Sequence, residues 1–538
     1  MSDSAQNFDV IILGVGHQSL VSANYLAKSG FSVCVLDAPI PASGATPYTD
    51  FHEGLKSGPC AHTPIPLNRK ILDELNLKEY GFDAEQQCHD ILSIAKGTDP
   101  FVFIGQPDSH SYINTIADIA PNDYARLIEL HEQLAELAQI MSNVDLSMPE
   151  YTQKGWKDIW AIFETAKHLA TNQDTLQKLF ADLMTMSLTQ FLEQNFETET
   201  LRGMLAFQSI LGSMINPDQE GSAAFLAMHV LALGENPLFG DNLQPLRGSI
   251  QPLMKALTQA GIANGVSFNT GATVTQILLE NNQFKGIETD TGVFTAPLLI
   301  ADINPQILFL DLIDETKIQP EFKLRISNMS NANGFIRVKL ALKELPQFTC
   351  LDGKDPASYL KGNTLIAPDI NYVRTAFDQT MNEGGSQRPN VSMIIPSLSD
   401  PELMADGLHC CSLVGQYFEP NLPDTKENKI AVAQAITAAV NDFAPNFQDS
   451  VVTFLPIMGE AFDKTLGPLN PDLTGGTLPL TRFLRSGLTH HSLFADLPFE
   501  GMYICGYGPE SSANAHLTDF GYHIAKHVNQ TRKPSAAA

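Results

Sequence analysis

The stretch that most constrains the fold is residues 9–37, DVIILGVGHQSLVSANYLAKSGFSVCVLD. Residues 10–13 are a short apolar run rich in β-branched side chains, which predicts a buried strand. Residues 19–28 carry apolar side chains at helical spacing, and a glycine ends that helix. Residues 31–36 form a second apolar run, which leads into Asp37. The segment therefore predicts a strand–turn–helix–strand unit, the context in which a glycine pair indicates dinucleotide binding.

Each part of this unit has a chemical role. Gly14 permits a tight turn, and Gly16 lets a pyrophosphate approach the backbone because no Cβ is in the way. The helix that follows offers the anion its N-terminal N–H groups and the positive end of its dipole. Asp37 is placed to accept hydrogen bonds from a ribose. Ser19 replaces the third glycine of the pattern, and a side chain this small still allows close packing of the helix on the strand.

Composition narrows the possible partners. The 538 residues are enough for two or three domains. The net charge of −27, from 33 basic and 60 acidic residues, argues against nucleic acid and anionic membrane surfaces as partners. No apolar run reaches the roughly 18 residues of a spanning helix, so membrane contact is expected to be peripheral at most. The few residues before the first strand leave no room for a signal peptide, which favours a cytoplasmic protein.

The cysteines and histidines predict no metal site. None of the seven cysteines forms a CxxC pair or has metal-ligand spacing, and several lie in apolar runs typical of buried thiols: Cys34, Cys410, Cys411 and Cys505. Reduced thiols again favour a cytoplasmic protein. His490 and His491 are adjacent, so their side chains point to different sides and we do not expect them to share a metal ion.

Further along the chain, helical and extended sections alternate. Residues 122–233 have a strongly helical period, and their methionines are typical of adaptable core packing. Residues 334–342 and 391–415 predict antiparallel strands, which the helix predicted at 426–442 covers. Residues 501–508 predict a strand ending in two glycines, with a helix after it. One face of the first helix in the helical section is formed by Tyr124, Leu127, Leu130, Leu134 and Leu137.

These separated pieces resemble the FAD-binding halves of the amine oxidase/phytoene desaturase superfamily, and above all its phytoene desaturase-like NAD(P)/FAD-dependent oxidoreductases. The resemblance covers nearly the whole chain. The family's opening motif is matched by Gly14, Gly16, His17, Leu20 and Ala23. Other matched stretches are LRGSIQPLMKAL (246–257), the meander TVTQILLENNQFKGIETDTG (273–292) with a turn at Asn281–Asn282, SDPELMADGLHCCSLVGQY (399–417), TGGTLPL (474–480) and GMYICGYG (501–508).

The resemblance implies an α/β two-domain flavoprotein. Its Rossmann-like FAD-binding domain would comprise residues 1–75, 235–305 and 465–538. A substrate domain of antiparallel sheet plus helical layer would comprise residues 76–234 and 306–464. The residues implied to bind FAD are Gly14, Gly16, His17, Ser19, Asp37, Gly44, Ala45, Val274 (through backbone groups at the adenine end), Gly506 and Gly508.

The chain also departs from the family pattern. Ser43 and Arg247 each replace the first glycine of a pair, and residues 509–516 (PESSANAH) replace a glycine-rich run beside the flavin ring. Either the site holds flavin in an altered setting, or flavin is weakly held or lost. The retained first motif, Asp37 and the glycines of residues 501–508 favour retained FAD.

With FAD bound, the resemblance implies dehydrogenation of a C–C or C–N bond in a lipophilic substrate by hydride transfer. The alternatives are a flavin-free escort protein similar to the Rab GDP-dissociation inhibitors and a redox-neutral flavin-dependent isomerase. No catalytic residue can be carried over from the family. Glu510, His516 and Asp519 would lie near the flavin, or would only be surface and helix-capping groups. The sequence leaves the electron acceptor and the oligomeric state open.

Overall fold

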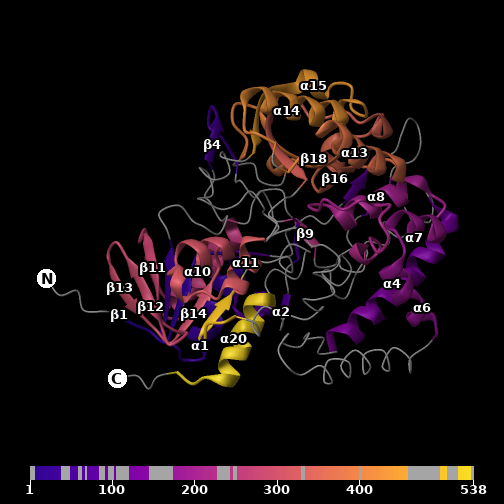
Figure 1. The fold of residues 1–538 in the computed structure, drawn as a ribbon. Coiled ribbons are helices and arrows are strands. Elements are labelled where there is room, and N and C mark those ends of the chain that lie inside the picture. The colour runs from indigo at the N-terminus through magenta and orange to yellow at the C-terminus, as the bar shows by residue number, and fades with distance from the viewer. Residues whose placement is uncertain are drawn as a thin grey trace.

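The computed structural model describes fifteen stretches of the chain, which Figure 1 shows as coloured ribbon. They are residues 6–37, 49–57, 64–66, 69–83, 91–94, 102–104, 120–143, 174–226, 243–245, 251–328, 334–398, 403–420, 422–458, 497–505 and 519–534.

A five-stranded parallel sheet is assembled from three distant parts of the chain. Its order is β10 (Ser267–Thr270), β3 (Val33–Asp37), β2 (Val10–Leu13), β14 (Leu298–Ala301) and β20 (Met502–Ile504). All four residues of β2 and of β14 are buried, as expected for parallel strands covered on both faces. The two strands and the intervening helix predicted for residues 9–37 are confirmed.

Three helices cover this sheet: α1 (His17–Lys28), α10 (Gln251–Ala263) and α20 (Asp519–Thr531). α1 contacts both of the others. It begins two residues earlier than its apolar period indicated, because the chain turns directly from Gly16 into the helix. Two short helices, α2 (Arg69–Glu74) and η1 (Leu77–Tyr80), lie beside α1 and α10 and share their apolar core.

A four-stranded sheet lies next to the parallel one, in the order β1 (Gln6–Asn7), β13 (Gly292–Thr295), β12 (Gln283–Thr289) and β11 (Val274–Glu280). Asn281 and Asn282 both have positive φ, at 51° and 61°, so the predicted hairpin turn is confirmed. Two helical segments pack into the core shared by the two sheets: η3 (Ile307–Asp311) and α11 (Pro320–Ser327). The short η4 (Glu315–Lys317) lies between them in the chain and is exposed. The domain boundaries expected from the sequence stay a prediction.

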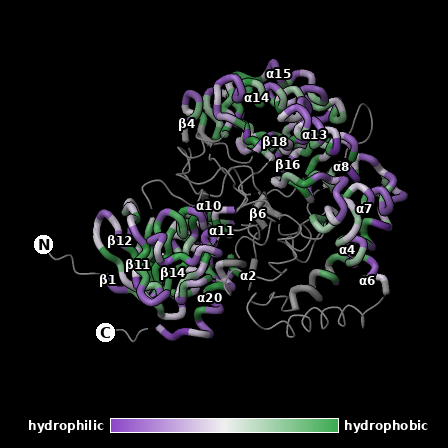
Figure 2. The backbone as a smooth tube through the Cα atoms, in the orientation of Figure 1, coloured by the Kyte–Doolittle hydropathy of each residue, from purple (hydrophilic) through white to green (hydrophobic). Residues whose placement is uncertain are grey.

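The largest sheet has seven strands, in the order β19 (Val451–Ile457), β15 (Phe335–Leu342), β18 (His409–Phe418), β17 (Gly385–Ile394), β16 (Asn363–Ile366), β7 (Ile91–Ser93) and β8 (Val102–Ile104). Only its β16–β7 pairing is parallel. Its outer face packs on α14 (Lys426–Asn441), the predicted covering helix. Figure 2 shows hydrophobic residues along β18 and β16 beneath that helix. Nearby short elements are η5 (Thr349–Leu351), α12 (Pro356–Tyr359), η6 (Pro396–Leu398) and α15 (Phe447–Ser450).

The second face of this sheet is polar. On β15, Val338 and Leu340 point into the core under α14, whereas Arg337 and Lys339 point to the opposite side. The register places Ser412 of β18 opposite Lys339. We call this side the polar face; its named members are Arg337, Lys339, Asn390, Ser392, Ser412 and Gln416.

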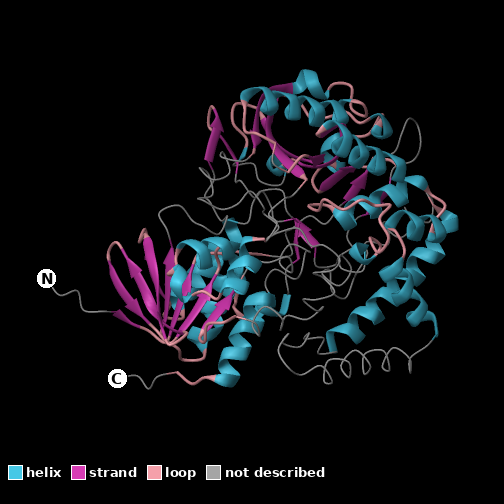
Figure 3. Ribbon diagram, in the orientation of Figure 1, coloured by secondary structure: helices cyan, strands magenta, loops and turns pink. Residues whose placement is uncertain are grey.

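A helical layer packs against one end of the seven-stranded sheet (Figure 3). It contains α4 (Pro121–Asn143), α6 (Asp174–Thr185), α7 (Leu188–Asn195) and α8 (Glu199–Ile210), together with α13 (Ile370–Glu383). The predicted apolar face of α4 is confirmed, since Leu127, Leu130, Leu134 and Leu137 are buried. Met204 is fully buried in this layer. Two small pairings complete the described strands: β4 (Thr49–His52) with β5 (Leu55–Ser57), and β6 (Pro64–Pro66) with β9 (Leu243–Pro245).

Candidate functional site

The topology itself marks one edge of the parallel sheet as a ligand site. From β2 the chain continues to β3 on one side, whereas β14 and β20 pair on the other side. The strand order therefore reverses between β2 and β14. Loops at the carboxyl ends of two such strands diverge and leave a crevice, which is where open α/β sheets bind ligands. The Gly14–Gly16 turn lies at the carboxyl end of β2, at this reversal.

The two glycines are required here by close contacts. Gly14 has φ +94°, and a Cβ on it would lie 2.5 Å from the carbonyl oxygen of Asp302. A Cβ on Gly16 would lie 2.1 Å from the carboxylate Oδ2 of the same residue. Asp302 directly follows β14 and is buried, and its backbone N–H donates to Leu13 O at 2.7 Å. Both glycines are therefore fixed by the neighbouring strand end as well as by any ligand.

Ser19 does more than fit where a third glycine is usual. Its hydroxyl accepts a hydrogen bond from Gly16 N at 2.9 Å. The single proton of the hydroxyl can be donated to Gly16 O at 3.0 Å or to Gly14 O at 3.2 Å. This local bonding holds the turn in shape. α1 carries no acidic residue in its first turn, so none of its own carboxylates occupies the positive end of the helix dipole. His17 is the first residue of α1 and is half-buried.

The far end of the predicted nucleotide site is also assembled by the fold. Asp37 is the last residue of β3, and its register partner is Thr270, the last residue of β10. Val274, the first residue of β11, comes four residues after Thr270 in the chain. It therefore comes soon after the strand end that lies beside Asp37. The structure thus brings Gly14, Gly16 and Asp37 to one edge, where the predicted site requires them.

Buried polar side chains hold α1 between its two neighbouring helices. Gln18 Oε1 accepts from Gly521 N at 2.8 Å, and Ser22 Oγ donates to Gly521 O at 2.8 Å. On the other side, Asn24 donates to Leu257 O of α10 at 3.0 Å. A helical-period analysis treats such residues as the polar side of the helix, and so it missed them. Gln18 and Ser22 thus bind α1, the helix that follows the Gly14–Gly16 turn, to α20, and Asn24 binds it to α10.

Several predicted residues lie outside the described part of the chain. For the cofactor these are Gly44, Ala45, Gly506 and Gly508. The same holds for Ser43, Arg247, Glu510, His516, and the pair His490 and His491. Asp519 is the first residue of α20. Asp302 was not among the predicted residues, although a polar residue directly after an apolar strand was a signal that could have found it.

The thiols near the site are not nucleophiles. Cys505 directly follows β20, and burial, reinforced by the Asp302 carboxylate, raises its pKa well above the usual value. The prediction that Cys34, Cys410, Cys411 and Cys505 are buried thiols is confirmed, and all four are in the reduced form. Within the described stretches, no group of three or more His, Cys, Asp or Glu residues is arranged to hold a metal ion.

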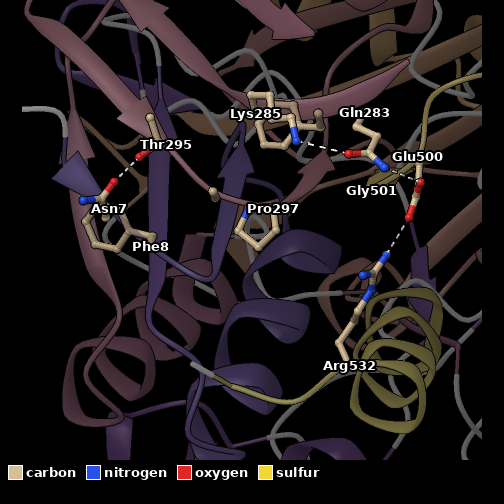
Figure 4. Close-up of a pocket in the computed structure, with 11 residues that line it drawn as sticks. Asn7, Phe8, Gln283, Lys285, Thr295, Pro297, Glu500, Gly501 and Arg532 are labelled. Atoms are coloured by element: carbon tan, nitrogen blue, oxygen red, sulfur yellow. Dashed lines mark hydrogen bonds and ion pairs between the residues drawn. The ribbon is translucent and has the colours of Figure 1, made fainter. Parts of the chain in front are cut away.

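A hollow of about 370 Å³ opens at the opposite edge of the parallel sheet (Figure 4). Phe8, Pro297 and Gly501 line it, and each precedes a parallel strand. Its polar groups bond to one another: Glu500 accepts from Gln283 at 2.9 Å and pairs with Arg532 at 3.4 Å. Because ligands of such sheets bind at the carboxyl ends of the strands, this hollow is not the candidate cofactor site.

The chain has full-length relatives among known proteins, although no protein-family profile matches it. It is 23% identical to the rat (Rattus norvegicus) "pyridine nucleotide-disulfide oxidoreductase domain-containing protein 2" over 532 residues, which cover 93% of this chain and 90% of the relative. It is 24% identical to the "4,4'-diaponeurosporene oxygenase" of Staphylococcus haemolyticus over 284 residues, covering 53% and 52% of the two chains. The chain is thus distantly homologous to the phytoene desaturase-like flavoprotein oxidoreductases.

This distant homology agrees with the fold. A solved structure of putrescine oxidase bound to putrescine superposes with a TM-score of 0.59 at 14% identity, covering 98% of this chain and 99% of that one. The expected α/β flavoprotein fold, with a parallel Rossmann-like sheet and further antiparallel sheets, is confirmed. Among the described residues, no helix combines the length and the apolar character that a membrane span requires.

Proposed function

We propose that this protein is an FAD-dependent oxidoreductase that dehydrogenates a C–C or C–N bond of its substrate by hydride transfer. The observation that carries the proposal is the Gly14–Gly16 turn at the N-terminus of α1, at the strand-order reversal of a parallel sheet. The distant homology supports the same chemistry. Bound FAD would supply the hydride acceptor.

The residues present fit a dinucleotide. The first turn of α1 would hold the pyrophosphate, because backbone N–H groups and the helix dipole favour an anion there. Asp37, at the end of β3, would accept hydrogen bonds from the ribose. The backbone of Val274 would contact the adenine end. The substrate would lie against the seven-stranded sheet and the helical layer, which exclude water from the reacting bond.

The first test is the visible absorption spectrum of the purified protein, before and after heat release of bound material. Oxidised-flavin bands roughly stoichiometric with protein, released as FAD rather than FMN, support the proposal. A colourless protein that takes up no added FAD overturns it and favours an escort protein similar to the Rab GDP-dissociation inhibitors. Turnover of a substrate without consumption of an electron acceptor would instead indicate a redox-neutral isomerase.

A variant pair localises the cofactor. Gly16→Val puts a branched side chain against the pyrophosphate position, so we expect flavin content to fall to near zero. Ser29→Val adds the same side chain at the exposed far end of α1 and should retain flavin. Since Gly16→Val also crowds Asp302, Asp37→Ala is the milder second variant and should weaken FAD binding without crowding the turn. Unchanged flavin content in both site variants would place the cofactor elsewhere.

The other expectations from the sequence stay proposals. A lipophilic substrate is proposed from the similarity to the 4,4'-diaponeurosporene oxygenase alone. The reduced thiols of the described cysteines support a reducing compartment such as the cytoplasm, because oxidising compartments favour disulfides.

A further inference from the structure

The strand β19 forms one edge of the seven-stranded sheet, and its outer side is apolar. Among the strands that the structure describes, it pairs only with β15. Three of its residues are large, apolar and exposed: Val452 at 47%, Phe454 at 41% and Leu455 at 42%. Single exposed apolar side chains are ordinary on a protein surface, but three of them within four residues of an edge strand indicate a contact surface.

The middle of this edge lacks the protection that edge strands usually have. Charged side chains, above all lysine, normally keep an edge from pairing with another chain. Residues 450–458, SVVTFLPIM, contain no charged side chain. Two features that do protect an edge lie toward its ends: a shift in the pairing with β15 that skips Val452, and Pro456. Residues 453–455, between them, carry neither protection.

Pro456 indicates which backbone groups face outward. It lies opposite Val338 of β15. A proline has no N–H, so an edge strand accommodates it where its nitrogen faces away from the neighbouring strand. Phe454, two residues earlier, has the same orientation, so we expect its N–H and C=O to face away from β15 as well. The edge therefore offers one backbone donor and one backbone acceptor beside an exposed aromatic side chain.

The exposed apolar residues lie on both faces of the edge, which favours a strand as the occupant. Phe454 lies opposite Leu340 and is therefore on the side of the sheet that α14 covers. Leu455 lies opposite Lys339 and is therefore on the polar face. A lipid surface contacts side chains that point the same way. A strand added to the edge instead packs against Phe454 on one face and against Leu455 on the other.

Charge favours a second copy of this chain as the source of that strand. Each copy carries a net charge of −27, so two copies repel each other wherever their acidic surfaces meet. The uncharged residues 450–458 allow a contact without that repulsion. A basic partner protein would gain no charge contact from this strand. Two identical edges are also complementary to each other when they run antiparallel about a two-fold axis, which is the commonest symmetry of oligomers.

We propose that β19 joins two copies of this chain into a dimer, with the two β19 strands antiparallel about a two-fold axis at Phe454. In this register Phe454 lies opposite its equivalent, and the two residues exchange both backbone hydrogen bonds. Val452 lies opposite Pro456 of the partner subunit, so no charged side chains meet. The two seven-stranded sheets join into one, which removes the unprotected edge. The dimer does not depend on the proposed function.

The first test is the mass of the purified full-length protein in solution, measured by light scattering during size-exclusion chromatography. We expect twice the mass of one chain, with the dimer fraction rising with protein concentration. A protein that is monomeric at every concentration up to roughly 100 µM overturns the proposal.

Lysine variants assign the contact to β19. Phe454→Lys places two ammonium groups opposite each other and Leu455→Lys adds a charge beside the axis, so each should raise the Kd of the dimer at least about tenfold. Leu324→Lys puts the same side chain on an exposed leucine of α11, 62% exposed, and should leave the Kd unchanged. A Kd unchanged in both β19 variants overturns the proposal, because another surface would then join the copies.

A cysteine variant tests the register and does not require the dimer to be weakened. The Cα atoms of a hydrogen-bonded antiparallel pair are about 5.5 Å apart, which a disulfide can span. Phe454→Cys should therefore form a covalent dimer on mild oxidation, visible on a non-reducing denaturing gel and reversed by a thiol. Leu324→Cys and the wild type should remain single chains on the same gel. A Phe454→Cys protein that forms no more covalent dimer than these controls overturns the two-fold axis at Phe454.

A lipid surface as the occupant gives a different result. A monomer that sediments with neutral phosphatidylcholine vesicles, and loses this binding in Phe454→Lys, would place β19 against lipid and overturn the dimer. The flavin content of the protein is independent of all these measurements, so the dimer and the cofactor proposals fail separately.

Discussion

The contact between α20 and α1 permits a quantitative test of the fold. A Cβ added to Gly521 would lie 2.0 Å from Gln18 O and 3.2 Å from Ser22 N, both backbone atoms. Backbone of a buried helix cannot rotate away as a side chain can, so in Gly521→Ala helix α20 must retreat by roughly 1 Å to restore ordinary van der Waals contact. That movement breaks the bonds from Gly521 N to Gln18 Oε1 and from Ser22 Oγ to Gly521 O, each 2.8 Å long.

The expected cost follows from these terms. Overpacking costs about 1–3 kcal/mol, and the two buried hydrogen bonds contribute about 1 kcal/mol each. Alanine's better helix propensity returns about 1 kcal/mol. Gly521→Ala should therefore lower the free energy of unfolding by about 2–4 kcal/mol, measured by urea titration. Lys526→Ala, at an exposed position of the same helix, should stay within about 0.5 kcal/mol of wild type. A Gly521→Ala protein as stable as wild type would refute the close packing of the two helices.

Three further predictions concern charge and titration. Asp302→Asn removes a carboxylate beside Gly16 at the N-terminus of α1. The free energy of unfolding, measured by urea titration, should fall by about 0.5–2 kcal/mol, because the carboxylate no longer stabilises the positive end of the helix dipole. FAD should bind more tightly because a negative charge beside its pyrophosphate is gone; weaker FAD binding would contradict this. Burial lowers the pKa of His409, so the unfolded chain binds its proton more readily. The free energy of unfolding should therefore be highest above about pH 6.5 and fall as the pH drops below that value. His409→Gln should reduce this dependence of the unfolding free energy on pH. An unchanged slope would refute the shift. Burial raises the pKa of the Cys34 thiol to about 12 and that of the half-buried Cys350 to about 11. Before unfolding, at about pH 8, Cys34 should therefore not react with a disulfide reagent, and Cys350 should react more slowly than an exposed thiol, as judged by peptide mass analysis; rapid labelling of Cys34 would contradict its burial.

The local pattern of apolar residues was sufficient to predict most of the helices and strands around the candidate cofactor site. Residues 10–13 and 33–37 are short and largely apolar and flank a single helix, so strand, turn and helix follow from nearby residues alone. The same holds for the meander turn at Asn281 and Asn282, because asparagine tolerates positive φ. The apolar stripe of α4 was also visible in sequence, since each buried leucine recurs at helical spacing.

The polar parts of the site could not be predicted in this way. FIRVKLAL, residues 335–342, alternates apolar and basic residues over part of its length, which usually indicates a strand with one solvated face. Here all eight residues are buried, so the alternation does not mark a solvated face. The position of Asp302 depends on β14 pairing beside β2, with Ala301 opposite Leu13. No local pattern reveals a pairing between strands so far apart in the chain.

The parallel sheet has a consequence for how the protein is made. β2 and α1 are synthesised long before β20 and α20, which complete the same sheet and its helical cover. At about 5–20 residues per second, roughly 25–100 s of synthesis separate these partners. Once β14 has been made, the nascent chain carries an incomplete sheet whose β14 edge lacks its neighbour until β20 follows. The parallel sheet therefore cannot be completed until β20 and α20 have been made, and nascent chains of this protein are expected to depend on chaperones that shield unpaired strands.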